Sequence, residues 1–244
     1  RTNTAIIEEF VDGEEITVDA YIEKGKAHIL CISYVDKIPQ NDGFIICRTR
    51  YPANLTVEVN AKVSCIADKI ASAFHLSDSP MLIQMIVHGS DVSVVEFCAR
   101  TGGGEKFHFI KEVSKFDVIK AVVDLTIGER PHIDDFSLQE CIINEFLYVN
   151  PGIFDHLEGF EEIYQEGVIK EYYLLKGKGT KCESSRSSGD RVAYYTIKTK
   201  TMELAKALDK QVNSRIKIID VNGDRKEHTS ELQSLAYLVC RLLL

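Results

Sequence analysis

The amino-acid sequence predicts an α+β protein in which mainly antiparallel sheets carry helices on a face. Short segments rich in β-branched and aromatic residues come in pairs around Gly-containing turns, as in β-hairpins. Between the pairs, apolar residues recur every three or four positions, as on the buried face of a helix. The pattern restarts after Asp134-Asp135, which predicts a second and smaller α+β part.

The first part contains a series of expected strands bounded by turns. These strands cover residues 4–11, 15–23, 27–35, 44–51, 81–87 and 93–100. A helix is expected from Val59 to Phe74, because its apolar residues have helical spacing. Ser114 and Asp117 have the spacing of a capping box, which predicts a second helix ending at Gly128.

The second part repeats this mixture on a smaller scale. Strands are expected over residues 140–149, 168–176 and 191–198, with a helix over 202–212 and a hairpin around Asn222-Gly223. We therefore predict one lobe over residues 1–135 and a closing α+β subdomain over residues 136–226.

Composition excludes several classes of protein. The chain has 244 residues and 45% hydrophobic content, which suits a globular core. Its net charge of -8 argues against a nucleic-acid binder, since such proteins carry basic surfaces. The 7 cysteines are scattered without a CxxC pair, so we expect free thiols in a reducing compartment. With no signal peptide or membrane-spanning run, the prediction is a cytoplasmic protein without a membrane partner.

Both ends of the sequence look unnatural. Residues 227–234 read "EHTSELQS", which resembles a translated sequencing adapter, and the chain begins with Arg1. The alternative is an amphipathic C-terminal helix with Leu232, Leu235 and Leu238 on one face. We expect residues 227–244 to be a non-native tail and the chain to be a fragment.

The most informative stretch is "VEFCARTGGG", residues 95–104. Glu96, Cys98 and Arg100 alternate along an expected strand, so their side chains share one face. Polar groups on one face of an apolar strand are costly unless that face is a site. The three following glycines allow the backbone to approach a ligand closely. A solvated hairpin tip is the alternative explanation.

Gln84 is the polar residue within the apolar run 81–87 on the partner strand. A three-residue loop would place Gln84 opposite Glu96, whereas a two-residue loop would place them on opposite faces. If they are opposite, their oxygens suit Mg²⁺, which commonly shares its site with substrate phosphates. Arg100 supplies a planar cation suited to phosphate.

A second stretch, "IEEFVDGEE" at residues 7–15, combines an extended segment, a Gly turn and a following carboxylate. The extended backbone can offer a carbonyl and an amide to an adenine ring, and the carboxylate past the turn can bind ribose hydroxyls. An acidic surface strand is the other interpretation.

Together, these stretches resemble the C-terminal lobe of the ATP-grasp ligases, which include carbamoyl phosphate synthase, biotin carboxylase and amino-acid ligases. "IIEEFVDGEEITVDAYI" resembles the family's adenine linker, and "MLIQMIVHGSDVSVVEFCAR" resembles its metal-binding hairpin. The resemblance covers residues 6–131, and residues 142–220 are more loosely similar to the closing subdomain of carboxylase-like and amino-acid-ligase branches.

The resemblance implies a role for several residues. Glu8 would accept from the adenine amine, the Glu9 carbonyl would assist it, and the Val11 amide would contact the ring. Glu15 would hold the ribose. The residues implied for the phosphates are Gln84 and Glu96, as ligands of Mg²⁺ (or Mn²⁺), and Arg100, as the contact of the transferring phosphate.

The implied activity is ADP-forming ligation of a small-molecule carboxylate to an amine or thiol through an acyl-phosphate, and a homodimer is compatible with it. Cys98 stands where the family has Asn, and a thiol is a poor ligand for a hard cation. The family's phosphate loop and two nucleotide-contacting lysines precede the adenine linker, so we expect the fragment alone to be inactive. A non-catalytic nucleotide-binding module is the alternative.

Other polar residues give weaker indications. His28, His75, His108 and His132 lack the spacing of a metal site. Arg48 and Arg50 are candidates for binding a substrate carboxylate, with simple charge balance as the alternative.

Overall fold

The computed structural model describes residues 5, 7–40, 43–133, 138–183, 187–223 and 225–226. The chain forms two compact units. Unit 1 comprises residues 1–32 and 53–136, and unit 2 comprises residues 33–52 and 137–244. Strand β2 (Lys26–Gln40) therefore contributes its first residues to unit 1 and its remaining residues to unit 2.

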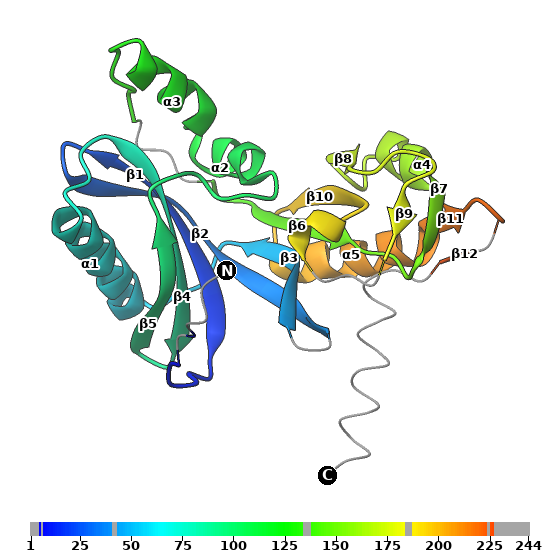
Figure 1. Cartoon of the computed structure of the whole chain (residues 1–244), viewed down its shortest axis with the longest axis horizontal. Helices are drawn as coiled ribbons and strands as arrows, with labels where there is room; N and C mark the ends of the chain where they lie inside the picture. Colours follow the sequence, from blue (N-terminus) through cyan, green and yellow to red (C-terminus); the bar gives the residue numbers. More distant parts are fainter. Residues whose placement is uncertain are drawn as a thin grey trace. The chain divides into compact units, whose positions relative to one another are not determined.

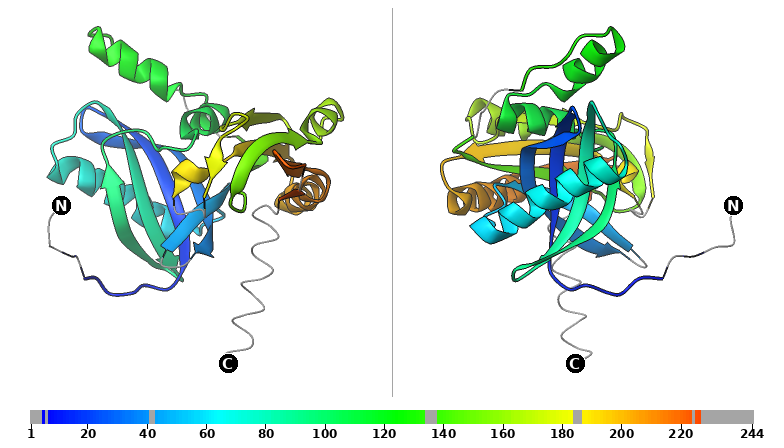
Figure 2. Two further views of the ribbon diagram at one scale, coloured as in Figure 1. Left: turned by 45° about the vertical axis from the view of Figure 1, so that its right-hand side comes forward. Right: turned by 90° about the vertical axis from the view of Figure 1, so that its left-hand side faces the viewer.

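Unit 1 is built on an antiparallel sheet. Its strands β1 (Glu14–Glu23), β4 (Ser79–His88) and β5 (Asp91–Cys98) lie in the order β5-β4-β1-β2. Helix α1 (Val57–Ala73) lies along one face of these strands (Figures 1 and 2). Its buried face carries Val59 and Val63, and the ring of Phe74 packs 4.6 Å from that of Phe97 on β5. The face of β5 that carries Phe97 is therefore the face that α1 covers.

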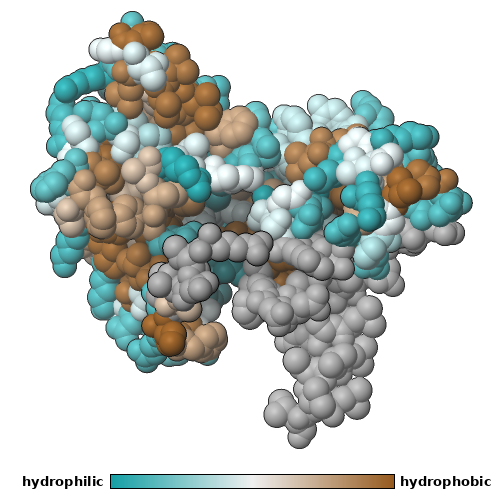
Figure 3. All heavy atoms as spheres, in the orientation of Figure 1, coloured by the Kyte–Doolittle hydropathy of each residue, from teal (hydrophilic) through white to brown (hydrophobic). Residues whose placement is uncertain are grey.

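Two shorter helices complete unit 1. Helices α2 (Lys106–Ser114) and α3 (Val118–Thr126) pack on Tyr21 of β1 through a cluster of buried side chains. That cluster contains Leu30, Ile110, Phe116, Val118 and Ala121. The outer side of α3 leaves apolar side chains exposed, visible as a brown patch in Figure 3.

The expected capping box is wrong in detail. Asp117 is the N-cap of α3 and accepts from the Lys120 amide at 2.9 Å. Ser114 instead ends α2, where its hydroxyl donates to the Ile110 carbonyl at 2.7 Å. Helix α2 has no counterpart in the sequence-based prediction, because it is a single short helix separated from three glycines only by its N-cap, Glu105.

Unit 2 contains two antiparallel sheets. The larger one joins the end of β2 to β3 (Gly43–Tyr51), β6 (Cys141–Leu147), β10 (Ala193–Thr199) and β8 (Glu171–Leu174), in this order. The second sheet has the order β12-β11-β7-β9. Its strands are β7 (Gly152–Glu158), β9 (Lys181–Cys182), β11 (Lys217–Asp220) and β12 (Arg225–Lys226).

Helices α4 (Phe160–Gln165) and α5 (Met202–Arg215) belong to unit 2, as does a 3₁₀ turn at Ser188–Asp190. Helix α5 packs against β6 and β10. The core beneath it is a single cluster that includes Ile143, Leu147, Tyr195 and Val212.

The predicted α+β class with mainly antiparallel sheets is confirmed. The strand expected over residues 4–11 is wrong within the described range, because residues 7–12 have no regular secondary structure and β1 begins at Glu14. Alternating apolar residues form a strand only where a neighbouring strand supplies hydrogen bonds, and the register of β1 with β4 starts at Glu14. The expected non-native tail, residues 227–244, lies outside the described residues.

Candidate functional site

The hairpin β4–β5 places Gln84 directly opposite Glu96. The connecting turn, Gly89-Ser90, is two residues long, since His88 pairs with Asp91. A regular ladder from such a turn would pair Gln84 with Val95 and turn Glu96 to the other face.

A β-bulge restores the pairing. Met85 pairs with Val94, and the next pair is Gln84 with Glu96, so Val95 is the extra residue. The expected pairing is thus present, although the three-residue loop on which it depended is not. A bulge leaves little trace in a sequence, because it is one added residue within an otherwise normal alternation.

The Gln84–Glu96 pair lies on the face of the sheet opposite to α1. Thr17 of β1 pairs with Gln84, so Thr17, Gln84 and Glu96 form one row across three strands. Gln84 is half-buried and Glu96 is exposed. We call this row and the side chains beside it the site face. Its carbonyl and carboxylate oxygens are ligands that suit a hard divalent cation.

Cys98 and Arg100 follow along β5 and its end. Cys98 pairs with Leu82, two positions beyond the Gln84–Glu96 pair, and is half-buried. Arg100 is exposed, and its Nη1 donates to the Thr101 carbonyl at 2.8 Å. The Arg100 guanidinium therefore binds the backbone of the loop that follows β5.

The expected adenine-binding residues precede and begin β1. Glu8 and Glu9 are exposed in a segment without regular structure, and Val11 is half-buried. Glu15 pairs with Ile86 of β4 and lies two residues before Thr17, so it shares the site face. A Cβ on Gly13 would lie 2.5 Å from the Val87 carbonyl oxygen, so glycine is needed where the segment turns onto β4.

Sequence reasoning missed a buried ion pair beside the row. Lys106, the first residue of α2, places its Nζ 3.1 Å from Asp19 Oδ2 and 3.0 Å from Thr17 Oγ1. Asp19 is 2% exposed and Lys106 is 8% exposed. The one available signal was Asp19 itself, a carboxylate within the apolar strand "ITVDAYI".

Arg48 and Arg50, the candidates for substrate binding, are engaged inside unit 2. Arg48 contacts the Glu145 carboxylate at 2.6 Å and that of Asp209 at 2.7 Å. Arg50 contacts Asp36 at 2.8 Å. These contacts favour the alternative given for Arg48 and Arg50, in which they balance the charge of neighbouring acids rather than bind a substrate carboxylate.

Burial controls the protonation of this network. Desolvation raises the pKa of Glu145 to about 8, although Arg48 opposes the shift and Asp209 adds to it. Tyr195 donates to Asp209 at 2.7 Å, and burial raises the pKa of Tyr195 well above its ordinary value. One guanidinium thus faces two buried carboxylates.

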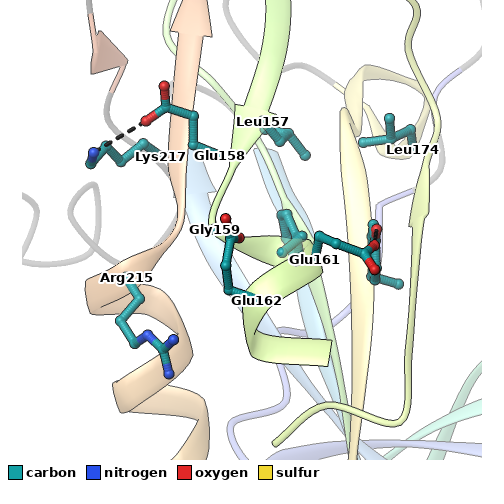
Figure 4. Close-up of a pocket in the computed structure, with 10 residues that line it drawn as sticks. Leu157, Glu158, Gly159, Glu161, Glu162, Leu174, Arg215 and Lys217 are labelled. Carbon is teal, nitrogen blue, oxygen red and sulfur yellow. Dashed lines mark hydrogen bonds and ion pairs between the residues drawn. The ribbon is translucent and has the colours of Figure 1, made fainter. Parts of the chain in front are cut away.

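Unit 2 also contains an open cavity of about 580 Å³ beside α4 (Figure 4). Its lining residues are Leu157, Glu158, Gly159, Phe160, Glu161, Glu162, Tyr172, Leu174, Arg215 and Lys217. Most of its charges are engaged locally. Lys217 lies 3.1 Å from Glu158, Arg215 binds Glu166 at 2.5 Å, and Tyr172 donates to Glu161 at 2.8 Å. This cavity is therefore a weaker candidate than the site face.

Among the described residues, no group of three or more His, Cys, Asp and Glu side chains is arranged for a metal ion. A cation on the site face would thus need ligands from a phosphate or water besides Gln84 and Glu96. In the same described ranges, no helix is both long and apolar enough to cross a membrane.

Comparisons with known structures show the fold. L-amino acid ligase from Bacillus licheniformis is 19% identical with a TM-score of 0.77, over 86% of this chain and 53% of that one. Phosphoribosylglycinamide synthetase from Anaerococcus prevotii is 15% identical with a TM-score of 0.74, over 87% of this chain and 55% of that one.

The biotin carboxylase domain of Hydrogenobacter thermophilus 2-oxoglutarate carboxylase, in complex with MgADP and bicarbonate, is 14% identical with a TM-score of 0.66, over 88% and 47%. The chain therefore spans about half the length of the structures it resembles. No curated protein matches its sequence.

Two family models match separate parts of the sequence. One is the ATP-grasp domain, over residues 1–107, and the other is the L-amino acid ligase C-terminal domain 2, over residues 145–220. The first contains the Gln84–Glu96 pair and the second contains most of unit 2. The sequence thus contains an ATP-grasp domain followed by a C-terminal domain of the L-amino acid ligase type.

Proposed function

We propose that this chain is the nucleotide- and metal-binding part of an ADP-forming ligase that joins a small-molecule carboxylate to an amine or thiol. The observation that carries the proposal is the cross-strand pair Gln84–Glu96, held opposite each other by the bulge at Val95. The ATP-grasp match over residues 1–107 supports the same assignment.

Each residue has a distinct part in the proposed reaction. Glu8, Glu9 and Val11 bind the adenine ring, and Glu15 orients the ribose. Gln84 and Glu96 hold Mg²⁺, or Mn²⁺ in its place, which neutralises charge on the terminal phosphates when bound. Arg100 leaves its contact with the Thr101 carbonyl and binds the transferring phosphate.

In this reaction the protein contributes mainly by positioning the reacting groups and by stabilising the charge on the transferring phosphate. The substrate carboxylate attacks the terminal phosphate of ATP, and ADP leaves. The amine or thiol then attacks the acyl carbon and displaces phosphate. Residues of the chain hold the reacting groups in line and stabilise the transferring phosphate, as phosphoryl transfer requires.

Metal binding tests the proposal in this chain. With ADP present, Mn²⁺ binding is measured by electron paramagnetic resonance for the unmodified chain and three variants. Glu96→Gln should raise the Kd for Mn²⁺ about tenfold or more, since loss of even outer-shell support costs that much. Cys98→Ser should leave it unchanged, and Glu8→Gln should weaken ADP binding. Equal Mn²⁺ binding by Glu96→Gln and the unmodified chain contradicts the assignment.

The second candidate is a nucleotide-binding module without catalysis. Cys98 favours it, because a thiol replaces the oxygen ligand through which a second metal ion is bridged in the family. Carboxylate-dependent release of ADP by the longer parent protein distinguishes the two, since the module binds nucleotide without releasing product.

A further inference from the structure

The loop of residues 101–105 connects Arg100 to α2, and its three glycines provide no side chains to anchor it. Free glycine backbone is conformationally costly to fix. If Arg100 is to meet a phosphate reproducibly, something else must hold this loop.

The Lys106–Asp19 ion pair supplies such an anchor. Both side chains are nearly fully buried, and their charged atoms lie 3.1 Å apart. The Lys106 ammonium also donates to Thr17 Oγ1 at 3.0 Å and lies 4.8 Å from the centre of the Phe109 ring. These contacts tie the start of α2 to β1.

Gly102 fits closely over this pair. A Cβ on Gly102 would lie 3.1 Å from Lys106 Cγ and 3.4 Å from Asp19 Oδ1. A side chain at Gly102 would therefore press against both members of the ion pair. The loop backbone at Gly102 thus lies next to Lys106 and Asp19, with little room between them.

The anchor is adjacent to the proposed metal pair. Thr17, which accepts from Lys106, is in the row with Gln84 and Glu96. Neighbouring strands are about 4.8 Å apart, so the Lys106 contact lies roughly 10 Å from Glu96 across the sheet.

We propose that Lys106, through its buried pair with Asp19, is a positioning residue that holds the Gly102–Gly104 loop and thereby sets Arg100 for the terminal phosphate of ATP. The inference rests on the proposed function. Lys106 acts through Arg100, so removing either residue removes the same interaction.

The test compares nucleotides with and without the terminal phosphate. Isothermal titration gives the Kd of Mg²⁺-ADP and of Mg²⁺ with adenylyl imidodiphosphate, a non-hydrolysable ATP analogue. The variants are Lys106→Met, Arg100→Met and the double variant. Lys111→Met is the matched control, because Lys111 is on the same helix but its side chain is 60% exposed and pairs with Asp117 at the surface.

Lys106→Met should raise the Kd of the ATP analogue about tenfold, as expected for loss of the charged hydrogen bond from Arg100 to the terminal phosphate. It should leave the Kd of ADP unchanged. Arg100→Met should have the same effect, and the double variant should be no worse than either single one. Lys111→Met should change neither Kd. Additive losses, or equal weakening of both nucleotides, overturn the positioning role.

Removing only Lys106 leaves the Asp19 charge buried, which can unfold the unit. Asp19→Asn/Lys106→Met removes both charges and keeps the volume. In this variant, hydrogen exchange of the amides in residues 101–106 should accelerate about tenfold or more, while β1 and β4 keep their protection. Unchanged exchange overturns the anchor. If the unmodified chain binds neither nucleotide, both this inference and the proposed function are wrong. If the unmodified chain binds both nucleotides and Lys106→Met binds the ATP analogue with the same Kd, only this inference is wrong.

Discussion

At the scale of single residues, the buried network of unit 2 shows how one cation serves two acids. Arg48 contacts both Glu145 and Asp209, and burial keeps the pKa of Glu145 near 8. Glu145 therefore takes up a proton on folding at neutral pH, because its ordinary pKa is 4.5. Such a group stabilises the fold below its ordinary pKa, and this contribution is lost as the pH rises through about 8.

The free energy of unfolding should therefore decline as the pH rises from about 5 to about 8, and Glu145→Gln should flatten that decline. Urea unfolding at several pH values measures it. Glu166→Gln is the control, since Arg215 holds the pKa of Glu166 below its ordinary value and Glu166 stays ionised throughout. A slope that survives Glu145→Gln means that another group takes up the proton.

Removal of the shared cation is a harsher change. Arg48→Met leaves the buried Asp209 charge without its cation and Glu145 without its hydrogen-bond donor, and should cost about 3–5 kcal/mol of stability. Arg50→Met, whose partner Asp36 is half-buried, should cost less. Equal losses in urea unfolding for the two variants contradict the assigned difference in burial.

At the scale of elements, periodicity in the sequence identified most of unit 1. The hairpins β1–β2 and β4–β5 and the helix α1 lie where they were expected, because strongly periodic apolar residues have one natural buried face, although β2 runs to Gln40, beyond the expected end at Val35. Helix α2 and the bulge at Val95 were missed. Both depend on contacts between segments. Helix α2 begins at Lys106, which is buried in unit 1, and the bulge is defined only by the register between β4 and β5.

Helix α3 gives a simple test of the corrected cap. Asp117→Ala removes the acceptor for the Lys120 amide and should cost about 1 kcal/mol in the free energy of unfolding. Lys111→Ala removes the surface ion pair to Asp117 but keeps the cap, so it should cost less than about 1 kcal/mol. A silent Asp117→Ala would show that the cap is dispensable.

At the scale of the whole molecule, one strand belongs to both units. Strand β2 runs from Lys26 to Gln40, and the boundary between the units falls after Ile32. Neither unit can lose its part of β2 without exposing a sheet edge. The two units should therefore unfold in one transition.

Thiol labelling can test this cooperativity, because each unit contains a buried cysteine. Cys31 in unit 1 is 2% exposed and Cys47 in unit 2 is 0% exposed, and burial raises the pKa of Cys47 to about 12. Both should stay unlabelled in the native state, whereas the exposed Cys65 reacts. Pulsed alkylation with mass spectrometry across a urea series should give Cys31 and Cys47 the same midpoint. Separate midpoints would show independent unfolding.

The candidate site was only partly predictable. Glu96 and Gln84 could be identified because polar residues stand out in apolar strands, and their pairing now supports the proposed metal site. Lys106 could not be connected to Asp19, since the two are far apart in sequence and only packing of α2 on β1 brings them together. The roles of Glu8, Glu9, Val11, Glu15 and Arg100 stay predictions.

The bulge at Val95 has a practical consequence for protein engineering. It separates the tip of the β4–β5 hairpin from the residues at its base, because the ladder is already interrupted between them. Residues added at Gly89-Ser90 can therefore be absorbed at the tip without changing which side chain faces Gln84, and exposed turns accept such insertions well. A fluorescent reporter sequence inserted there would follow nucleotide binding from the same hairpin while leaving Glu96 in place.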